Sequence, residues 1–262
     1  MSKDNMKDLF SKYLETGIRF DGRKLDEFRD ISIEVGVSKT AEGSAQVKIG
    51  DTEVIAGVKL SIGAPYPDTP EEGALMVGAE FLPMSSPDFE SGPPGIESIE
   101  LARVIDRGIR ESHAVDNKKL CITKGEQVWT VSVDICTVND DGNLLDASGL
   151  ATLAALMDSY FPEFDGVAVD YKKKSKKKLP IVKYPIPITV YKIGEKLFVD
   201  PSIDEADHYD ARLTVTMLEN DLVCALQKGG SAPLTAEQID EMVALAQKTA
   251  PKLRKKLQGN KK

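Results

Sequence analysis

The sequence predicts an α+β protein with mixed α/β layers, built as two similar lobes that each combine a β-sheet with long helices. Two observations support this prediction. Runs that alternate apolar and polar residues, as strands do, occur in both halves of the chain. In each half, a long segment with helical apolar periodicity follows those runs. No repeat of individual residues is visible, so the similarity of the lobes lies in the order of their elements.

The N-terminal half is expected to begin with an amphipathic helix, with Asp4 as its N-cap and Gly17 as its end. The next strands form a hairpin, because Gly50-Asp51 is a suitable two-residue turn. A Pro/Gly-rich loop is expected over 83–95. The remaining predictions are strands at 29–37, 44–62, 73–82, 119–122 and 127–138, and helices over 96–113 and about 146–160.

The C-terminal half is expected to end in a helix that begins at Thr235, because Thr235 and Gln238 have the spacing of a capping box. The lysine run Lys172–Lys178 is interpreted as a solvated connecting loop. One domain is expected over 1–262, with an N-terminal lobe at about 1–165, a connector at about 171–180 and a C-terminal lobe at about 181–262. Strands are predicted at 166–171, 188–191, 196–200, 211–218 and 222–227.

Composition restricts the class of protein. Of the 262 residues, 41% are hydrophobic and 29% are charged, which is typical of a globular protein and excludes a disordered chain. No apolar run is long enough to span a membrane, and the polar N-terminus does not look like a signal peptide, so we expect a cytoplasmic protein. Cys121, Cys136 and Cys224 are expected to be reduced, buried thiols. With only two histidines, neither a metal site nor a cofactor is predicted.

The charge is distributed unevenly. Residues 172–178 contain six lysines, residues 248–262 contain seven basic residues, and neither segment has an acid. Outside these segments 21 basic residues face 42 acidic ones, although the whole chain has a net charge of only −8. Net charge therefore does not exclude nucleic acid, because local patches set the field that a ligand meets. For the 172–178 run we expect at most a modest electrostatic effect.

The most informative local pattern is an arginine stripe, Arg103, Arg107 and Arg110, on the predicted helix 96–113. The i, i+4, i+7 spacing places the three guanidinium groups on one helix face, where like charges repel and an anion would stabilise them. Bidentate contact with RNA phosphates is one interpretation. Internal pairing with nearby acids is the other, and the pattern alone favours it; these acids are Glu100, Asp106 and Glu111.

Two further segments have weaker signals. Clustered carboxylates can hold Mg²⁺ or transfer protons, but no local metal-loop signature accompanies the acidic segment, so a solvated loop is favoured. Gly229-Gly230-Ser231 could hold a phosphate with backbone N–H groups, although a plain turn is favoured. The acidic segment contains Asp200, Asp204, Glu205, Asp207 and Asp210.

Three segments, in order, resemble the RNase PH family: Gly17–Arg23, Ser44–Val54 and Glu100–Arg107. The resemblance covers nearly the whole chain. It implies the two-lobed RNase PH-like fold. Active members of the family are phosphorolytic 3′→5′ exoribonucleases, in which inorganic phosphate attacks the terminal phosphodiester and releases nucleoside diphosphates. Three other segments resemble the non-catalytic RNase-PH-like subunit of the archaeal exosome ring, namely 65–73, 89–94 and 199–202.

The family pattern also implies that this chain has no catalytic residues of its own. An ungapped register puts Arg212 where the second catalytic Asp belongs and Ala206 where the first belongs, beside a retained Glu205. A guanidinium in place of a carboxylate reverses the charge that the chemistry needs. In the segment 229–233 Pro233 has no N–H to donate, and the run 141–145 lacks the arginine of active members.

The resemblance changes the interpretation of the arginine stripe, because the corresponding family helix contacts the RNA backbone. Contact of Arg103, Arg107 and Arg110 with RNA phosphate is then favoured over internal pairing. The resemblance implies a catalytic RNase-PH-like subunit as a partner, with which this chain would form a trimer of heterodimers, a six-membered ring. The other implied partners are RNA-binding cap proteins and single-stranded RNA, and no membrane is expected. Two alternatives stay open: an autonomous enzyme with a relocated carboxylate site at Asp204 or Glu205, and a stand-alone RNA-binding scaffold.

Overall fold

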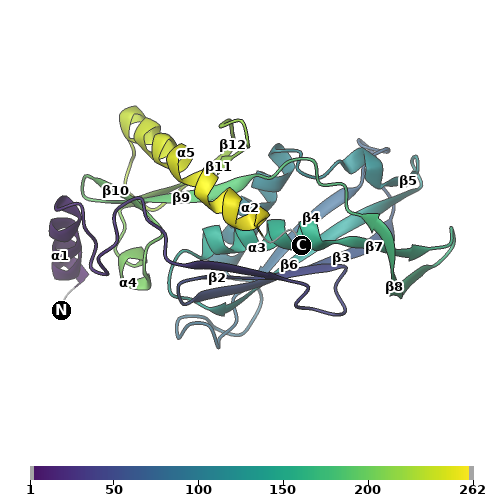
Figure 1. The fold of residues 1–262 in the computed structure, drawn as a ribbon, viewed down its shortest axis with the longest axis horizontal. Helices are drawn as coiled ribbons and strands as arrows, with labels where there is room; N and C mark the ends of the chain where they lie inside the picture. The colour runs from purple at the N-terminus through teal and green to yellow at the C-terminus, as the bar shows by residue number, and fades with distance from the viewer. Residues whose placement is uncertain (1–2, 260–262) are drawn as a thin grey trace.

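Two β-sheets enclose a central helix, α3 (Leu144–Asp158), in the computed structural model, which describes residues 3–259 (Figure 1). From Leu145 to Leu156 every residue of α3 is buried. A helix that is apolar on all sides is stable only inside a core. Its contact with the second sheet is close, since a Cβ at Gly149 would lie 2.2 Å from Cγ of Pro187. One hydrophobic cluster therefore runs through both lobes.

The N-terminal sheet has the strand order β1-β2-β3-β6-β4, with β5 added on β6. The predicted hairpin is present: β2 and β3 pair antiparallel, with Ile49 opposite Thr52 and Gly50 at φ +58°. Its strands show alternating burial because one face packs on the core. The bounds are β1 Ile31–Val35, β2 Gly43–Ile49, β3 Thr52–Gly63, β4 Ala74–Glu80, β5 Cys121–Thr123 and β6 Gln127–Asn139.

Helix α2 (Ile96–Glu111) packs against β4, α3 and β12. It begins after the extended Gly95 without a side-chain cap and ends two residues before the predicted His113. It crosses the second sheet closely, because a Cβ at Gly108 would lie 3.2 Å from Thr216. Short 3₁₀ helix η1 (Asn117–Leu120) then leads into β5.

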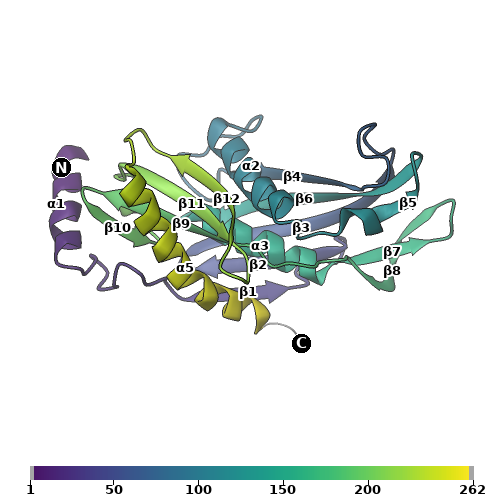
Figure 2. The same ribbon diagram turned by 90° about the horizontal axis from the view of Figure 1, so that it is seen from above.

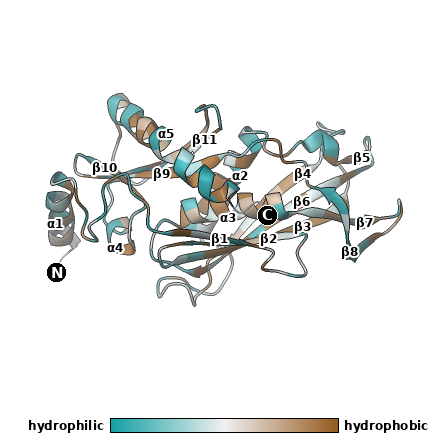
Figure 3. Ribbon diagram, viewed as in Figure 1, coloured by the Kyte–Doolittle hydropathy of each residue, from teal (hydrophilic) through white to brown (hydrophobic). Residues whose placement is uncertain are grey.

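The C-terminal sheet has the order β10-β9-β11-β12. All eight residues of β9 are buried, since α1, α3 and α5 all pack against this strand. The capping box at Thr235 and Gln238 starts α5 as predicted. In Figure 3, α5 carries both hydrophilic and hydrophobic residues, which fits its position over one face of the sheet. The bounds are α1 Lys3–Glu15, β9 Ile186–Ile193, β10 Lys196–Val199, α4 Ile203–Ala206, β11 Ala211–Met217, β12 Val223–Gly229 and α5 Ala236–Gln258.

The lysine run is not a loop, so that interpretation is wrong. It lies in strand β8 (Val169–Lys178), which pairs with β7 (Tyr160–Phe164) in a two-stranded ribbon. The ribbon projects at the end of the molecule opposite α1 (Figure 2). Lysines are compatible with such a strand, because the ribbon leaves their ammonium groups in water while the backbone pairs with β7. The predicted strand 166–171 overlaps only the first residues of β8, and its lysine part was interpreted as a loop because no apolar alternation marks it.

Two smaller expectations also change. Helix α1 begins at Lys3, so Asp4 lies inside it and is not its N-cap. Cys121, Cys136 and Cys224 are free as expected but partly exposed rather than buried. Lys261 and Lys262 of the second basic segment lie outside the described residues. Between residues 3 and 259, no helix is long and apolar enough to cross a membrane.

Candidate nucleic-acid interface

Helix α2 presents the arginine stripe to solvent. Arg103, Arg107 and Arg110 are all exposed because the opposite face of the helix is fixed in the core. The three cations therefore share one accessible face next to β12 and β4. The residues that bury the opposite face are Leu101, Ala102, Val104, Ile105, Gly108 and Ile109.

The three arginines differ in their internal partners. Arg110 donates from Nη2 to Oδ1 of Asp106 at 2.7 Å, and this carboxylate raises the pKa of Arg110. Arg107 donates from Nη1 to Oε1 of Gln227 on β12 at 3.0 Å. Arg103 makes no ion pair or hydrogen bond with any residue that the structure describes. The stripe thus keeps two guanidinium groups without a carboxylate partner.

Glu100, which the sequence offered as a partner for the stripe, points elsewhere. Its Oε2 lies 2.8 Å from Nη2 of Arg212 on β11. Glu111 forms no ion pair within the described part of the chain. Internal pairing therefore explains Arg110 alone, through Asp106, and not the stripe as a whole.

Arg212 is enclosed between α2 and the turn after β12. It stands opposite Gly229 in the β11–β12 register, and a Cβ at Gly229 would lie 2.6 Å from Cζ of Arg212. The absence of a side chain at Gly229 thus leaves room for the guanidinium in this position. Nη1 of Arg212 is buried without a hydrogen-bond partner among the described residues. Glu100 is the one carboxylate among these residues that forms an ion pair with the Arg212 guanidinium.

The Gly229-Gly230-Ser231 segment is a turn, as favoured from the sequence. Gly230 has φ +83°, and a Cβ there would lie 2.7 Å from the carbonyl oxygen of Asp210. Ala232 donates its N–H to that same oxygen at 3.1 Å. The turn packs on Arg212 and Tyr209, so it does not form an open anion cradle.

The acidic segment is not a solvated loop, and that interpretation is wrong for its best-buried members. Glu205 is buried and paired with Arg19, and its Oε2 accepts from the backbone N–H of Ser202 at 2.9 Å. Asp204 is exposed in the same short helix, α4. These two carboxylates do not converge on one point. Within the described residues no group of three or more His, Cys, Asp or Glu side chains could hold a metal ion.

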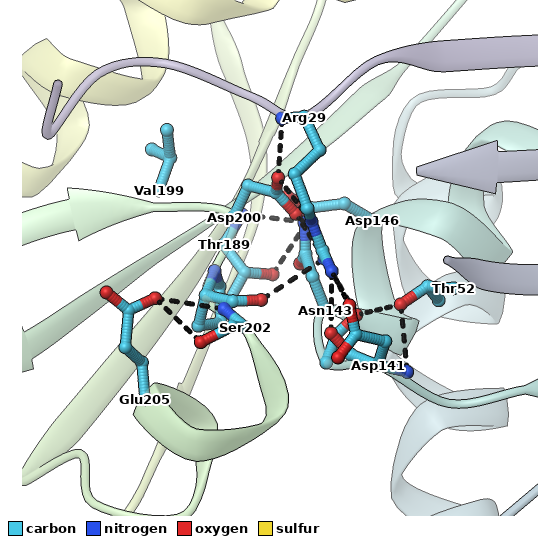
Figure 4. Close-up of polar contacts among 12 residues, drawn as sticks. Arg29, Thr52, Asp141, Asn143, Asp146, Thr189, Val199, Asp200, Ser202 and Glu205 are labelled. Carbon is cyan, nitrogen blue, oxygen red and sulfur yellow. Dashed lines mark hydrogen bonds and ion pairs between the residues drawn. The ribbon is translucent and has the colours of Figure 1, made fainter. Parts of the chain in front are cut away.

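Asp200 is the centre of an ionic network between the lobes (Figure 4). Its side chain is fully buried. Arg29 donates to it from Nη2 at 2.8 Å, from Nε at 3.0 Å and from the backbone N–H at 2.8 Å, and Arg23 donates from Nη1 at 2.7 Å. Burial alone would raise the pKa of Asp200, but the hydrogen bonds and charge of Arg29 outweigh burial and lower it. The carboxylate is thus held ionised in the interior.

The same network uses the loop before α3. Arg29 also donates to Oδ2 of Asp141 at 2.8 Å, and Asn143 donates from Nδ2 to Oδ1 of Asp200 at 2.9 Å. Asn143 adopts a left-handed conformation with φ +62°. The segment 141–143 therefore ties the two lobes together.

Asp146, in the first turn of α3, extends the contact to β9. Its Oδ1 accepts from the N–H and from Oγ1 of Thr189, both at 2.8 Å, whereas Oδ2 is buried without a partner among the described residues. Burial raises the pKa of this carboxyl to about 8. Asp146 is therefore a buried acid that holds its proton near neutral pH.

The two-lobed fold, with an exposed arginine stripe on α2 and Arg212 enclosed on β11, defines a protein of the RNase PH type. The sequence matches the 3′ exoribonuclease family, domain 1, over residues 27–162 and domain 2 of the same family over residues 183–249. The chain belongs to this family, and the resemblance found in its sequence is confirmed.

Relatives and solved structures agree with this assignment. The chain is 48% identical over 255 residues to "Exosome complex component Rrp42" of Archaeoglobus fulgidus, covering 97% of this chain and 96% of the relative. It resembles a chain of the "archaeoglobus fulgidus exosome with RNA bound to the active site", with a TM-score of 0.90, 47% identity and 97% and 98% of the two chains covered. A chain of the "Archaeal exosome core" matches with a TM-score of 0.85, 44% identity and coverage of 98% and 97%.

Proposed function

We propose that this chain is the non-catalytic, structural and RNA-guiding subunit of a phosphorolytic 3′→5′ exoribonuclease complex, the archaeal exosome core. Its main partner is a catalytic RNase-PH-like subunit, and three heterodimers of the two chains form a six-membered ring. RNA-binding cap proteins and single-stranded RNA are the other partners. The ion pair between Arg212 and Glu100 carries this proposal.

The ion pair removes the chemistry that the family's carboxylates supply. A carboxylate at position 212 could bind a metal ion or take part in proton transfer, whereas a guanidinium does neither at neutral pH. Here the guanidinium is also occupied by Glu100 and packed against Gly229. The alternative of a relocated carboxylate site loses support, because Glu205 is neutralised by Arg19.

The arginine stripe is proposed to hold RNA by its phosphates. Arg103 and Arg107 have no carboxylate partner among the described residues, so a phosphate can approach them without displacing one. The Asp106 pair of Arg110 is exposed, and such pairs contribute only about 0–1 kcal/mol, so exchange for a phosphate costs little. Contacts of this kind guide RNA without reading its sequence.

The chain is proposed to act as one domain over 1–262, with lobes at about 1–165 and 181–262. The hydrophobic cluster that passes through α3 supports a single rigid unit. The Asp200 network supports it as well, since Arg29 and Asp200 come from opposite ends of the sequence. A rigid unit suits a ring component that completes a neighbour's active site.

The test is reconstitution. The purified chain is incubated with 5′-labelled single-stranded RNA and inorganic phosphate, alone and then with the catalytic RNase-PH-like subunit. We expect no nucleoside diphosphate from the chain alone and processive release after the partner is added, together with a mass of a six-membered ring. Phosphate-dependent degradation by the chain alone, abolished by Asp204→Asn or Glu205→Gln, would overturn the proposal. Failure to assemble with any such partner would favour a stand-alone scaffold.

A further inference from the structure

The β7–β8 ribbon carries a concentrated positive charge that the proposed function does not use. Its six lysines between Lys172 and Lys178 are all exposed. Within the described chain only Lys173 has a carboxylate partner, Asp170 at 3.4 Å. Lysines two positions apart on a strand lie on the same face, so their like charges repel one another. The ribbon therefore carries an electrostatic cost that a bound polyanion would offset.

The second basic segment of the sequence meets the base of this ribbon. A groove of about 490 Å³ is lined by Lys178 at the end of β8 and by Leu257 at the end of α5. The last turns of α5 expose Lys252, Lys255 and Lys256. The ends of two lysine-rich segments that are far apart in the sequence thus meet at one groove, which Asp158 and several apolar side chains also line. We call Lys172–Lys178 together with these three lysines the basic surface.

Aromatic rings lie among the lysines of the ribbon. Tyr171 is 50% exposed, with Nζ of Lys59 at 5.1 Å from its ring centroid. Nζ of Lys177 lies 4.8 Å from the ring centroid of Phe161. An exposed ring within a basic strand is the combination that single-stranded nucleic acid binds, by base stacking and phosphate contact. Neither feature alone would distinguish a nucleic acid from another polyanion.

The acids of the ribbon do not cancel this charge. Asp165 accepts hydrogen bonds from the N–H groups of Val167 and Ala168 at the tip of the ribbon. Asp170 accepts from the N–H of Lys172 at 3.0 Å. Asp170 also pairs with Lys173, so it offsets one of the six lysines, and the other five have no carboxylate partner among the described residues.

We infer that the basic surface binds the phosphate backbone of single-stranded RNA, as a contact separate from the arginine stripe. The choice of RNA as the polyanion rests on the proposed function. The surface is distinct from the stripe, because α2 and the C-terminal end of α5 lie on opposite sides of α3 (Figure 2). Lysines also protect edge strands from aggregation, but that role does not account for the basic end of α5.

The test compares two variants of the full chain that remove the same charge. Lys172, Lys174 and Lys176 are replaced by Gln in one variant. In the control, Lys12 of α1, Lys24 of the segment after α1 and Lys196 of β10 are replaced by Gln; α1 and β10 lie at the end of the molecule opposite the ribbon. Binding of a fluorescent oligoadenylate is measured by anisotropy from 50 to 300 mM salt. We expect the ribbon variant to lose at least about ten-fold in affinity, with a salt slope shallower by about 2, and the control to change less than about two-fold.

Equal losses in the two variants would show an effect of net charge alone and would overturn the inference. Binding to phosphatidylserine vesicles that depends on the ribbon, with RNA affinity unchanged, would overturn it in favour of a membrane. A third variant, Lys252, Lys255 and Lys256 to Gln, tests the α5 part and should also lose affinity. The stripe variant Arg103, Arg107 and Arg110 to Gln separates the two proposals: if it binds normally while the ribbon variant does not, the role of the stripe fails and the basic surface stands.

Discussion

Arg212 and Glu100 lie on different elements, β11 and α2, and their Nη2 and Oε2 atoms are 2.8 Å apart. The two partners differ in burial: 11% of the Arg212 side chain is exposed and 33% of that of Glu100. A buried guanidinium depends on its anion, whereas a half-exposed carboxylate can be solvated by water. Loss of Glu100 is therefore expected to lower the free energy of unfolding more than loss of Arg212 does.

The first prediction uses this asymmetry. Glu100→Gln leaves Arg212 as a buried cation without an anion, so it should lower the free energy of unfolding by about 1.5–3 kcal/mol. Arg212→Gln leaves Glu100 in contact with water and should cost less. Urea unfolding of both variants and of the double variant measures the two costs and their coupling. Equal costs with no coupling would contradict a functional ion pair at this position.

The second prediction concerns Asp200, whose carboxylate binds Arg29 and Arg23 inside the molecule. Asp200→Asn leaves both guanidinium groups without that charge and should cost about 3–5 kcal/mol of unfolding free energy. Asp204→Asn is the matched control, because Asp204 is exposed in the same segment and should change stability by less than about 0.5 kcal/mol. Similar values for the two variants would refute a structural role for the network.

The third prediction concerns the arginine stripe in the assembled complex. Arg103→Gln removes a cation without an internal partner, so RNA affinity should fall and the salt slope should become shallower by about 0.7, with stability unchanged. Replacing Arg103, Arg107 and Arg110 together should flatten the slope by about 2 while assembly stays intact. Fluorescence anisotropy and mass measurement check both parts. Wild-type RNA affinity in the triple variant would exclude the role proposed for the stripe.

Local rules explain what the sequence could predict. The hairpin at Gly50-Asp51 and the start of α5 at Thr235 depend on turn and capping chemistry within a few residues, and both are present. The positions of Arg103, Arg107 and Arg110 on one exposed face follow from helical spacing in the same way.

Other features depend on contacts that no local pattern encodes. Arg29 and Asp200 are separated by 171 residues, so only the folded structure shows that they pair. The segments that contain Asp200 and Arg23 could be recognised from the sequence as resembling the family, but their contact could not. The acidic segment resembled a solvated loop because its partners, Arg19 and Arg29, lie far away in the sequence. The lysine part of β8 was not predicted as a strand since it has no apolar alternation, and only pairing with β7 makes it one.

The last prediction concerns Asp146, which burial keeps protonated up to a pKa of about 8. Between about pH 4 and pH 8 the folded chain holds a proton at this carboxyl that the unfolded chain releases. The free energy of unfolding should therefore decrease as pH rises through this interval, by at most about 1.4 kcal/mol per pH unit, and become level above pH 8.

The variant Asp146→Asn should lose this pH dependence. Its amide oxygen can still accept from Thr189, as Oδ1 does now, and the side chain has no proton to release. Asp140, whose pKa burial also raises, is present in both proteins, so the difference between their profiles isolates Asp146. Urea unfolding of both proteins at pH 5, 6, 7, 8 and 9 gives the two profiles. Parallel profiles from pH 5 to pH 9 would show that Asp146 is already ionised in the folded chain over this range and would contradict the prediction.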